Sequence, residues 1–505
     1  MSPNGFRKLQ GLSDLSLKDL KEKTLQAGIM KVGAQGVNFI LRVGSLMVLA
    51  RLLDPKDFGL VGMVTAVTGV FNIFKDAGLS LVTIQRSTIT NEEVSTLFWL
   101  NMAVGVILGL LSFAMAPILV MFYHESILFW VTAALATGFV FNAAGVQHSA
   151  LLQRDLKFGI LSVVEIAAQL VGTVVGIVLA LGGYGYWALV VMTVVNPAVS
   201  TLLLWLTAGW VPGKLHRGTD IRSMLCFGGT ATLNGLVTYA SYNIEKVLLG
   251  RFWGAEALGI YGRASQLIAI PSENLNAATG GVLFSALSRL QDDPGRFKNY
   301  FLKSYTLLLS LTLPATIACA LFADDIVFLV LGEKWMEAGG IFRLLTPAIT
   351  VLAMINPTYW LVVSLGMAER SLKIALAITP LVIVAYIIGL PYGPSGVALA
   401  YSIAMFIWLI PHMVWSTHGT MLSLRDMVRA AGRPLVSAIA AVVVTYAAQS
   451  FYGASLTPVS RLATGGAILV VVYLWILLWV MGQKELYLDL LRGLSGGKFS
   501  ARTAG

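Results

Sequence analysis

The chain of 505 residues is 57% hydrophobic and only 12% charged, whereas soluble proteins average about 25% charged residues. This composition excludes a water-soluble globular protein. The formal net charge of +10 raises nucleic-acid binding as one explanation, so the placement of the basic residues has to be considered. Cys226 and Cys319 both lie in apolar stretches, with no spacing that suggests a disulfide framework or a metal site.

The first 26 residues are charged and rich in helix-forming residues. They contain no early apolar core followed by a small-residue cleavage site, so a cleaved signal peptide is not expected. The first apolar run begins only near Ala27. We therefore predict a cytoplasmic amphipathic segment over residues 1–26.

About fourteen runs are long and apolar enough to cross a bilayer, since a spanning helix needs about 20 mostly apolar residues. They lie near residues 27–50, 58–85, 94–121, 127–150, 159–182, 184–208, 223–250, 257–288, 299–322, 341–365, 372–390, 394–415, 434–451 and 461–482. The sequence therefore predicts an all-α integral membrane protein with about 14 transmembrane helices.

The basic residues are distributed unevenly across these spans. With the N-terminus in the cytoplasm, 24 of the 35 Lys and Arg residues fall in cytoplasmic loops and tails, 5 in the opposite loops and 6 within spans. This asymmetry is typical of the positive-inside rule and places both termini in the cytoplasm. Topology and attraction to anionic membrane lipid explain the net charge, and no nucleic-acid partner is expected.

Two parts of the chain resemble each other at an offset of about 200 residues. Residues 49–60 align with residues 249–260, where an arginine, a glycine and flanking apolar residues coincide. Further along, Arg154 aligns with Arg370 at an offset of 216. Six spans separate the members of each pair, so the two halves have the same orientation and form a parallel repeat.

The repeat predicts two six-helix bundles followed by two extra helices. The expected divisions are an N-lobe at 27–208, a cytoplasmic linker at 209–222, a C-lobe at 223–415, helices 13 and 14 within 416–482, outside the interlobe interface, and a cytoplasmic tail at 483–505. Two six-helix repeats in parallel are typical of transporters, in which the substrate site lies at the interface between the repeats.

Four predicted spans, the first, second, seventh and eighth, carry polar residues at helical spacing. In the first, five polar residues lie on one face because their spacings are 4, 3, 4 and 3; they are Lys31, Gln35, Asn38, Arg42 and Ser45. A charge at the bilayer centre costs at least ~2.5 kcal/mol, so such residues face protein or water and mark a functional site. The predicted cavity residues are Lys31, Asn38, Arg42, Asn72, Lys75, Asn234, Arg263 and Asn274.

A structural explanation of these charges stays open. Lys31, Lys246, Arg263 and Arg343 lie within a few turns of a span end, from which long side chains reach the membrane surface. Arg42 is deeper in its span and lies midway along a continuous polar stripe, which favours a functional role.

Intramembrane carboxyl groups are candidates for coupling transport to protons or sodium, because desolvation raises the pKa of a carboxyl group. Glu165 and Glu273 are the main candidates. Asp76 and Glu245 have cationic neighbours and are weaker ones. A helix-packing hydrogen bond is the alternative role for all four.

Motifs for nucleotide hydrolysis and metal binding are missing from the sequence. There is no phosphate-binding loop of the G-x-x-x-x-G-K-[ST] type. No cofactor or metal is expected, because the histidines lack ligand spacing and are interpreted as interfacial residues; they are His124, His148, His216, His412 and His418.

Enzymatic activity is not expected either. A membrane glycosyltransferase or polymerase normally needs acidic residues in a sizeable extracytoplasmic loop. The longest such loop here, residues 323–340, is short and partly apolar. Its acidic residues Asp324 and Asp325 keep this alternative open.

Several segments, taken in order, resemble bacterial polysaccharide transporters of the colanic-acid-exporter type. These transporters belong to the multidrug, oligosaccharidyl-lipid and polysaccharide exporter superfamily. The similarity runs over nearly the whole chain, and the succession of motifs is more specific than any one of them. The segments are residues 50–60, 75–79, 151–158, 251–261 and 286–293.

The resemblance implies a flippase that moves a polyprenyl-pyrophosphate-linked oligosaccharide from the cytoplasmic to the periplasmic leaflet of the bacterial inner membrane by alternating access. Intramembrane cations would hold the pyrophosphate and asparagines the sugar hydroxyls. A polysaccharide polymerase and glycosyltransferases are possible partners. The alternative is a cation-coupled multidrug exporter of the same superfamily, which the extra spans and excess of intramembrane cations argue against.

Overall fold

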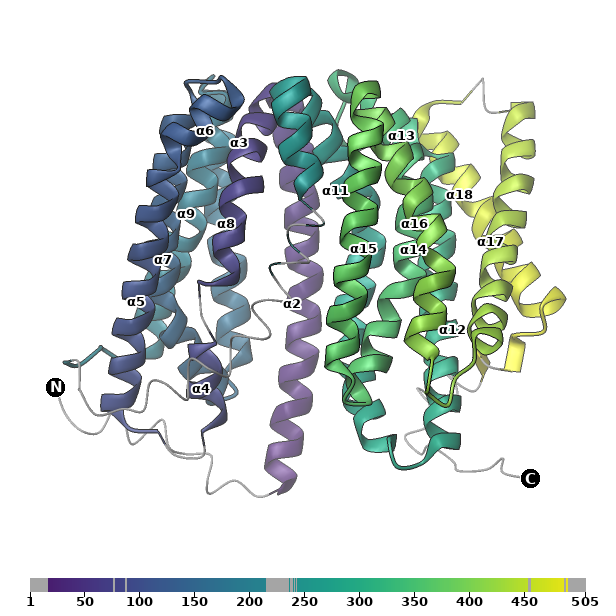
Figure 1. Cartoon of the computed structure of the whole chain (residues 1–505), viewed down its shortest axis with the longest axis horizontal. Helices are drawn as coiled ribbons and strands as arrows, with labels where there is room; N and C mark the ends of the chain where they lie inside the picture. Colours follow the sequence, from purple (N-terminus) through teal and green to yellow (C-terminus); the bar gives the residue numbers. More distant parts are fainter. Residues whose placement is uncertain are drawn as a thin grey trace. The chain divides into compact units, whose positions relative to one another are not determined.

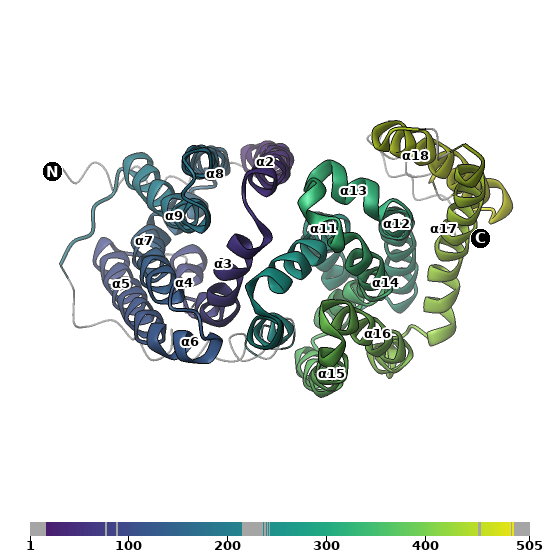
Figure 2. The ribbon, with the colours of Figure 1, turned by 90° about the horizontal axis from the view of Figure 1, so that it is seen from above.

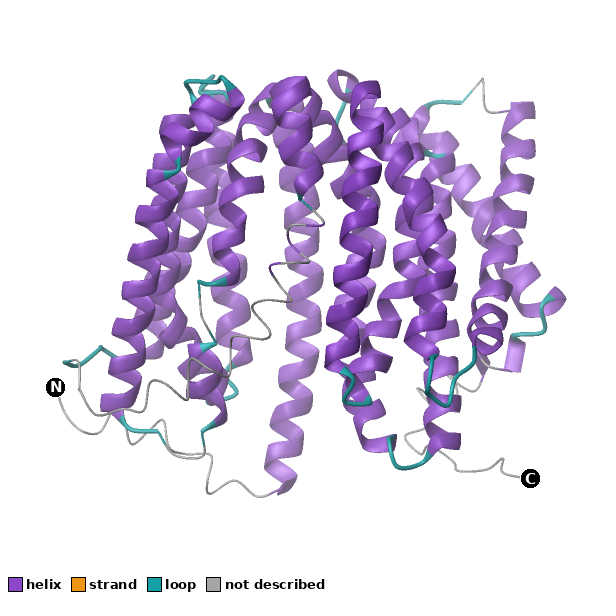
Figure 3. Ribbon diagram, in the orientation of Figure 1, coloured by secondary structure: helices purple, strands orange, loops and turns teal. Residues whose placement is uncertain are grey.

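The computed structural model describes residues 17–75, 78–86, 89–214, 243–452 and 456–485, and the single residues 236, 239, 241, 487 and 488. Within this part of the chain every regular element is a helix and none is a strand (Figure 3). Ten of its helical segments are long and apolar enough to cross a membrane. The prediction of an all-α membrane protein is therefore confirmed.

The ten segments account for eleven of the predicted spans, because Glu369–Thr417 covers two of them. The remaining predicted spans are 58–85, 223–250 and 257–288, and the first part of 223–250 lies largely outside the described residues. All three carry predicted polar stripes. The span 58–85 is missing because its helix is broken into shorter pieces.

The chain divides into two compact units, which are described separately. Unit 1 contains residues 1–262 and 330–334, and unit 2 contains residues 263–329 and 335–505. Helix α11 (Ile244–Leu290) contributes to both. This division follows spatial proximity, whereas the predicted lobes follow the sequence repeat, and the lobes stay a prediction.

Unit 1 is built around helix α7, which packs against α4, α5, α6 and α9. Helix α8 packs against α9 on one side and α2 on another (Figures 1 and 2). Its helices are α2 (Leu17–Leu52), α3 (Pro55–Thr68), the 3-10 helix η2 (Gly69–Ile73), α4 (Leu79–Gln85), α5 (Asn91–Ala114), α6 (Ala116–Tyr123), α7 (Leu128–Arg154), α8 (Phe158–Leu181), α9 (Tyr186–Ala208) and the first part of α11.

The second predicted span is a broken helix. Regular α-helix ends at Thr68 and continues as the 3-10 helix η2 to Ile73, and helix resumes at Leu79. Gly78 precedes α4 with a φ of 75°, a left-handed conformation that glycine adopts without steric cost. The prediction of one continuous helix over 58–85 was therefore wrong.

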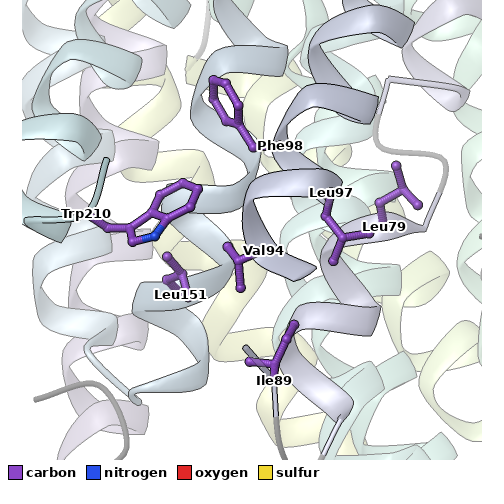
Figure 4. Packing of buried hydrophobic residues seen from close by; sticks show 7 residues of the cluster. All are labelled: Leu79, Ile89, Val94, Leu97, Phe98, Leu151 and Trp210. Carbon is purple, nitrogen blue, oxygen red and sulfur yellow. The ribbon is translucent and has the colours of Figure 1, made fainter. Parts of the chain in front are cut away.

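A cluster of buried apolar residues joins α4, α5 and α7 near one end of unit 1 (Figure 4). Its members are Leu79, Ile89, Val94, Leu97, Phe98, Leu151 and Trp210. Trp210 lies in the predicted interlobe linker, and its indole Nε1–H donates to Asn91 Oδ1 over 2.7 Å. The Gly213 amide donates to Ser95 Oγ over 2.9 Å. The first residues after α9 are thus fixed to α5.

Unit 2 is built around α14, which packs against α12, α15 and α16. Its elements after α11 are α12 (Pro294–Leu321), α13 (Ala323–Val330), the short 3-10 helices η3 (Glu333–Trp335) and η4 (Leu390–Tyr392), α14 (Glu337–Ser364), α15 (Ala368–Gly389), α16 (Gly393–Thr417), α17 (Leu424–Tyr452), α18 (Pro458–Trp475) and the π-helical η6 (Ile476–Val480). Trp335, in η3, is the first residue after the 330–334 segment of unit 1.

The two extra C-terminal helices belong to unit 2. Helix α17 packs against α12, and α18 packs against α17. The buried Tyr473 hydroxyl of α18 donates to the Ser310 carbonyl of α12 over 2.7 Å. These helices are therefore attached to α12 by a hydrogen bond as well as by apolar packing.

The structure corrects one of the two sequence alignments on which the repeat was based. Helices α8 and α15 begin at Phe158 and Ala368. Arg154 lies in the last turn of α7, whereas Arg370 lies in the first turn of α15. The two arginines do not occupy equivalent positions, so the match at an offset of 216 was wrong.

Candidate functional site

The polar face of α2 is only partly covered by its own unit. Gln35 and Arg42 are exposed, and Asn38 is half-buried with Oδ1 lacking a hydrogen-bond partner. Ser45 is buried, and its hydroxyl donates to the Arg42 carbonyl over 3.0 Å. The guanidinium group of Arg42 is thus presented away from the packing of unit 1.

Arg42 lies deep in its helix. It precedes the last residue of α2, Leu52, by ten residues, which corresponds to about 15 Å along the axis at 1.5 Å per residue. This is about half the hydrocarbon thickness of a bilayer. A cation at this depth requires water, protein or an anionic ligand beside it.

Asn72 and Lys75 lie in and just after η2, where the second predicted span is broken, and both are exposed. Irregular backbone at membrane depth is tolerated where it lines a water-filled cavity or is buried in protein. Discontinuous helices also form the substrate and ion sites of several transporter folds. The break therefore adds a second reason to place these residues at a site.

Glu245, in the first turn of α11, is the buried carboxylate among the described coupling candidates. It is 5% exposed, and its Oε2 has no hydrogen-bond partner. The neighbouring Lys246 directs its Nζ to Asn243 Oδ1 over 2.8 Å. Glu165, on α8, is exposed instead. The structure thus buries the acid that the sequence ranked lower, and the roles of both in coupling stay a prediction.

Arg263 lies in the part of α11 that belongs to unit 2 and is half-buried. It donates a hydrogen bond to Gln266 Oε1, one turn further along the same helix. Arg263 and Gln266 therefore share one face of this helix.

The remaining predicted site residues fall outside the described part of the chain. Asp76 and Asn234 are not described at all, and the side chains of Lys31, Glu273 and Asn274 are not described, although their backbones belong to α2 and α11. Of the cavity residues, the structure brings Asn38 and Arg42 together on α2, and Asn72 and Lys75 at the break. A common cavity for all of them stays a prediction.

Polar residues buried between α5 and α7 were not predicted. Asn101 and Gln147 are both 0% exposed. The Thr83 hydroxyl donates to Gln147 Oε1 over 2.6 Å, while Asn101 has no partner for either side-chain atom. The signal available in the sequence for a buried polar contact was an amide side chain within an apolar span.

His148 is not interfacial, contrary to the expectation from sequence. It is 0% exposed and stacks on Trp205 with the ring centroids 4.6 Å apart. Phe98 and Trp210 make edge contacts with the same imidazole. The sequence placed His148 near a span end, but could not show that aromatic residues of α5 and α9 enclose it.

The acids that kept an enzymatic alternative open are engaged in ion pairs. Asp325 is buried and accepts from Arg461 Nε of α18 over 2.8 Å. Asp324 pairs with Arg343 of α14. Among the described residues, no group of three His, Cys, Asp or Glu side chains could hold a metal ion.

Comparison with known families gives one match over more than half of the chain. The profile of a family described as "Polysaccharide biosynthesis protein" matches residues 48–339. The chain is 27% identical over 440 residues to the lipopolysaccharide biosynthesis protein WzxC of Escherichia coli (strain K12), covering 85% of this chain and 88% of the relative. It is 26% identical over 380 residues to the teichuronic acid biosynthesis protein TuaB of Bacillus subtilis (strain 168), covering 73% and 72%.

Two solved structures show that the fold is shared with membrane transporters. The lipid II flippase MurJ in an inward closed conformation matches with a TM-score of 0.71 and 14% identity, covering 93% of this chain and 100% of that one. An inward-facing multidrug resistance MATE transporter of the MOP superfamily matches with a TM-score of 0.61 and 15% identity, covering 79% and 99%.

Proposed function

Because the chain belongs to the polysaccharide biosynthesis protein family, we propose that it is a flippase for lipid-linked oligosaccharides. It moves repeat units attached to polyprenyl pyrophosphate from the cytoplasmic to the periplasmic leaflet of the bacterial inner membrane by alternating access. The observation that carries the proposal is the family match over residues 48–339. The structural match to the lipid II flippase MurJ, which covers 93% of the chain, supports it.

The chemistry of the described residues supports an anionic, hydroxyl-rich substrate. A pyrophosphate group needs cations and hydrogen-bond donors in a low-dielectric setting, and Arg binds such groups with two parallel hydrogen bonds. Arg42 supplies this charge at mid-helix, and Lys75 supplies another at the break. Asn38 and Asn72 provide amide groups for sugar hydroxyls on the same two segments.

Both termini lie in the cytoplasm in this proposal, because most basic residues flank the spans on the side of the termini. The reaction is movement across the bilayer with no covalent step, so the chain is not an enzyme. Glycosyltransferases then supply the substrate on the cytoplasmic face, and a polymerase consumes it on the other. Glu245 and Glu273 are the carboxyl groups we assign to ion coupling.

A multidrug exporter of the same superfamily is the second candidate, favoured by the fold match to the MATE transporter. Deletion of the gene separates the two functions. Loss of a flippase stops the surface polysaccharide and leaves lipid-linked repeat units in the inner leaflet. Loss of a drug exporter changes only the sensitivity to cationic compounds.

Reconstitution tests the proposal directly. Purified protein in vesicles is given defined polyprenyl-pyrophosphate oligosaccharides, and the fraction that becomes accessible to a glycan-modifying reagent on the opposite face is followed with time. We expect flipping that depends on the protein. Equal rates in protein-free vesicles, with unchanged polysaccharide in the deletion strain, would refute the proposal.

A further inference from the structure

Two helices of unit 1 cross at glycines that the sequence repeat relates to each other. Helix α3 and the start of α11 approach so closely that a Cβ atom at Gly59 would overlap the carbonyl group of Ala255. A Cβ atom at Gly259 would overlap the carbonyl group of Pro55 and lie 3.2 Å from the Gly59 nitrogen. No residue other than glycine fits at either position without a backbone shift.

The two close contacts are equivalent under the repeat. An offset of 200 residues converts Gly59 into Gly259 and Pro55 into Ala255. The contact of Gly59 with Ala255 therefore becomes the contact of Gly259 with Pro55. The crossing has local pseudo-twofold symmetry, so each repeat supplies the glycine that the other repeat's backbone needs.

Two further contacts between the repeats flank the crossing. Arg251, from the second repeat, lies over the Phe122 ring at the end of α6 in the first repeat, with its Cζ 5.7 Å from the ring centroid. In the other direction, Asp54 of the first repeat accepts from Lys334 Nζ over 2.7 Å. Lys334 lies in the segment 330–334, which belongs to unit 1.

A further hydrogen bond joins the repeats about two turns away from the crossing. The hydroxyl of Tyr239, in the seventh predicted span, donates to the Thr65 carbonyl over 2.9 Å and to the Ala66 carbonyl over 3.1 Å. These carbonyl groups belong to the last turn of α3, directly before η2. The second repeat thus holds α3 at the crossing and again at the break.

We propose that the crossing of Gly59 and Gly259 is the outward gate of the transporter, closed in this structure. The proposal rests on the proposed flippase function. The crossing lies at the end of α2 and the start of α3, opposite the end of the bundle where the charge distribution places the cytoplasm. Release of an oligosaccharide on that side requires the two repeats to separate there, and backbone contact without side chains lets them close tightly again.

The first experiment adds one methyl group at the crossing. Gly59→Ala and Gly259→Ala force the helices apart, whereas Gly262→Ala on α11 is the matched control, because nothing lies within 4 Å of its Cβ position. In a background with Cys226 and Cys319 replaced by serine, Thr65→Cys reports access from outside by reaction with an impermeant maleimide. We expect labelling to rise at least threefold in both crossing variants and to stay at the parental level in Gly262→Ala.

The second experiment locks the crossing. It does not depend on whether the protein folds with Gly59→Ala or Gly259→Ala. A Cβ atom at Gly62 lies 3.5 Å from Leu258 Cδ2, an ordinary contact. In the double variant Gly62→Cys with Leu258→Cys, a short, reducible bifunctional thiol reagent is expected to link the two side chains and to slow flipping at least tenfold, with recovery after reduction. The single-cysteine variants show whether either substitution alone affects flipping.

The outcomes separate this proposal from the proposed function. A cross-link that forms without slowing flipping, or equal labelling of all three glycine variants, would each overturn the gate. If the parent protein flips no lipid-linked oligosaccharide, the flippase function fails. Labelling from outside still decides whether the crossing controls access.

Discussion

Helices α2 and α5 are both apolar spans of unit 1, but their glycines lie in opposite surroundings. On α5, Gly105 faces Ala143 and the Phe139 carbonyl of α7. A Cβ atom at Gly109 would lie 3.2 Å from the Ala136 carbonyl oxygen of α7. On α2, the Cβ positions of Gly33, Gly36 and Gly44 have nothing within 4 Å. Small residues bring helices together on α5, whereas the small residues of α2 have no packed neighbour.

The contrast teaches that a span's composition does not reveal its role. Helix α5 serves the internal packing of its unit, and from Phe98 onward its buried positions follow the spacing of one helix face. Helix α2 buries mainly its last turns, around Ser45 to Ala50, and presents Arg42 outward. Substitutions on α5 should therefore reduce folded protein, and substitutions on α2 should reduce transport.

The largest effect is expected for Arg42→Ala. It should abolish polysaccharide export while membrane insertion stays normal, because the substrate loses a cation at mid-membrane depth. Export is measured as surface polysaccharide, and insertion as protein in the membrane fraction. Gly44→Ala, two residues further on the same helix, is the control and should export normally. Normal export by inserted Arg42→Ala protein would remove this residue from the site.

Gly105→Val should have the opposite effect to Arg42→Ala: it should lower stability and leave transport intact. Its added atoms overlap Ala143 across the α5–α7 contact, and overpacking of this kind costs about 1–3 kcal/mol. We expect a lower thermal midpoint in detergent and less protein in the membrane, with transport per folded molecule retained. Gly138→Ala on α7, where nothing lies within 4 Å, should leave the midpoint unchanged. An unchanged midpoint for Gly105→Val would mean that this helix pair tolerates separation.

The same distinction between packing and exposure applies to the arginine pairs of unit 2. Arg461→Gln leaves the buried Asp325 carboxylate without its charged partner and should cost about 1–3 kcal/mol. Arg343→Gln breaks a pair in which both side chains are about half exposed, so its cost should stay below about 1 kcal/mol. Thermal unfolding of the two variants compares them. Equal shifts would show that burial of Asp325 is unimportant.

The smallest effect concerns coupling. Glu245→Gln removes a titratable group at a buried position and should flatten the pH or sodium dependence of flipping while much of the rate is retained. Glu273→Gln is the parallel test of the second candidate. Glu256→Gln, at an exposed position on α11, is the control. Profiles that coincide with the parent for both variants would exclude these two carboxyl groups from coupling.

The sequence predicted well those features that depend on apolar length. The prediction of a span at 159–182 agrees within one residue at each end with α8, Phe158–Leu181. The connection expected after residue 250 is reduced to a kink at Gly254, whose φ is 82°. Hydropathy measures the length of an apolar run, but a single positive φ changes the path of the chain without changing its composition.

The candidate site was less predictable because helical phase gives a direction but no neighbour. Phase put Arg42 on a polar face, but it could not show which of the acids Glu165 and Glu245 is buried, and only the structure shows that the second one is. His148 lies among rings contributed by α5 and α9, which are distant in sequence. Such enclosures depend on which helices pack together.

The glycine crossing also constrains how this chain can change over generations. Gly59 and Gly259 each lie against the main chain of the opposite helix. A larger residue at either position would therefore displace both helices. A substitution in one helix would be accepted only if the other helix changed its path as well.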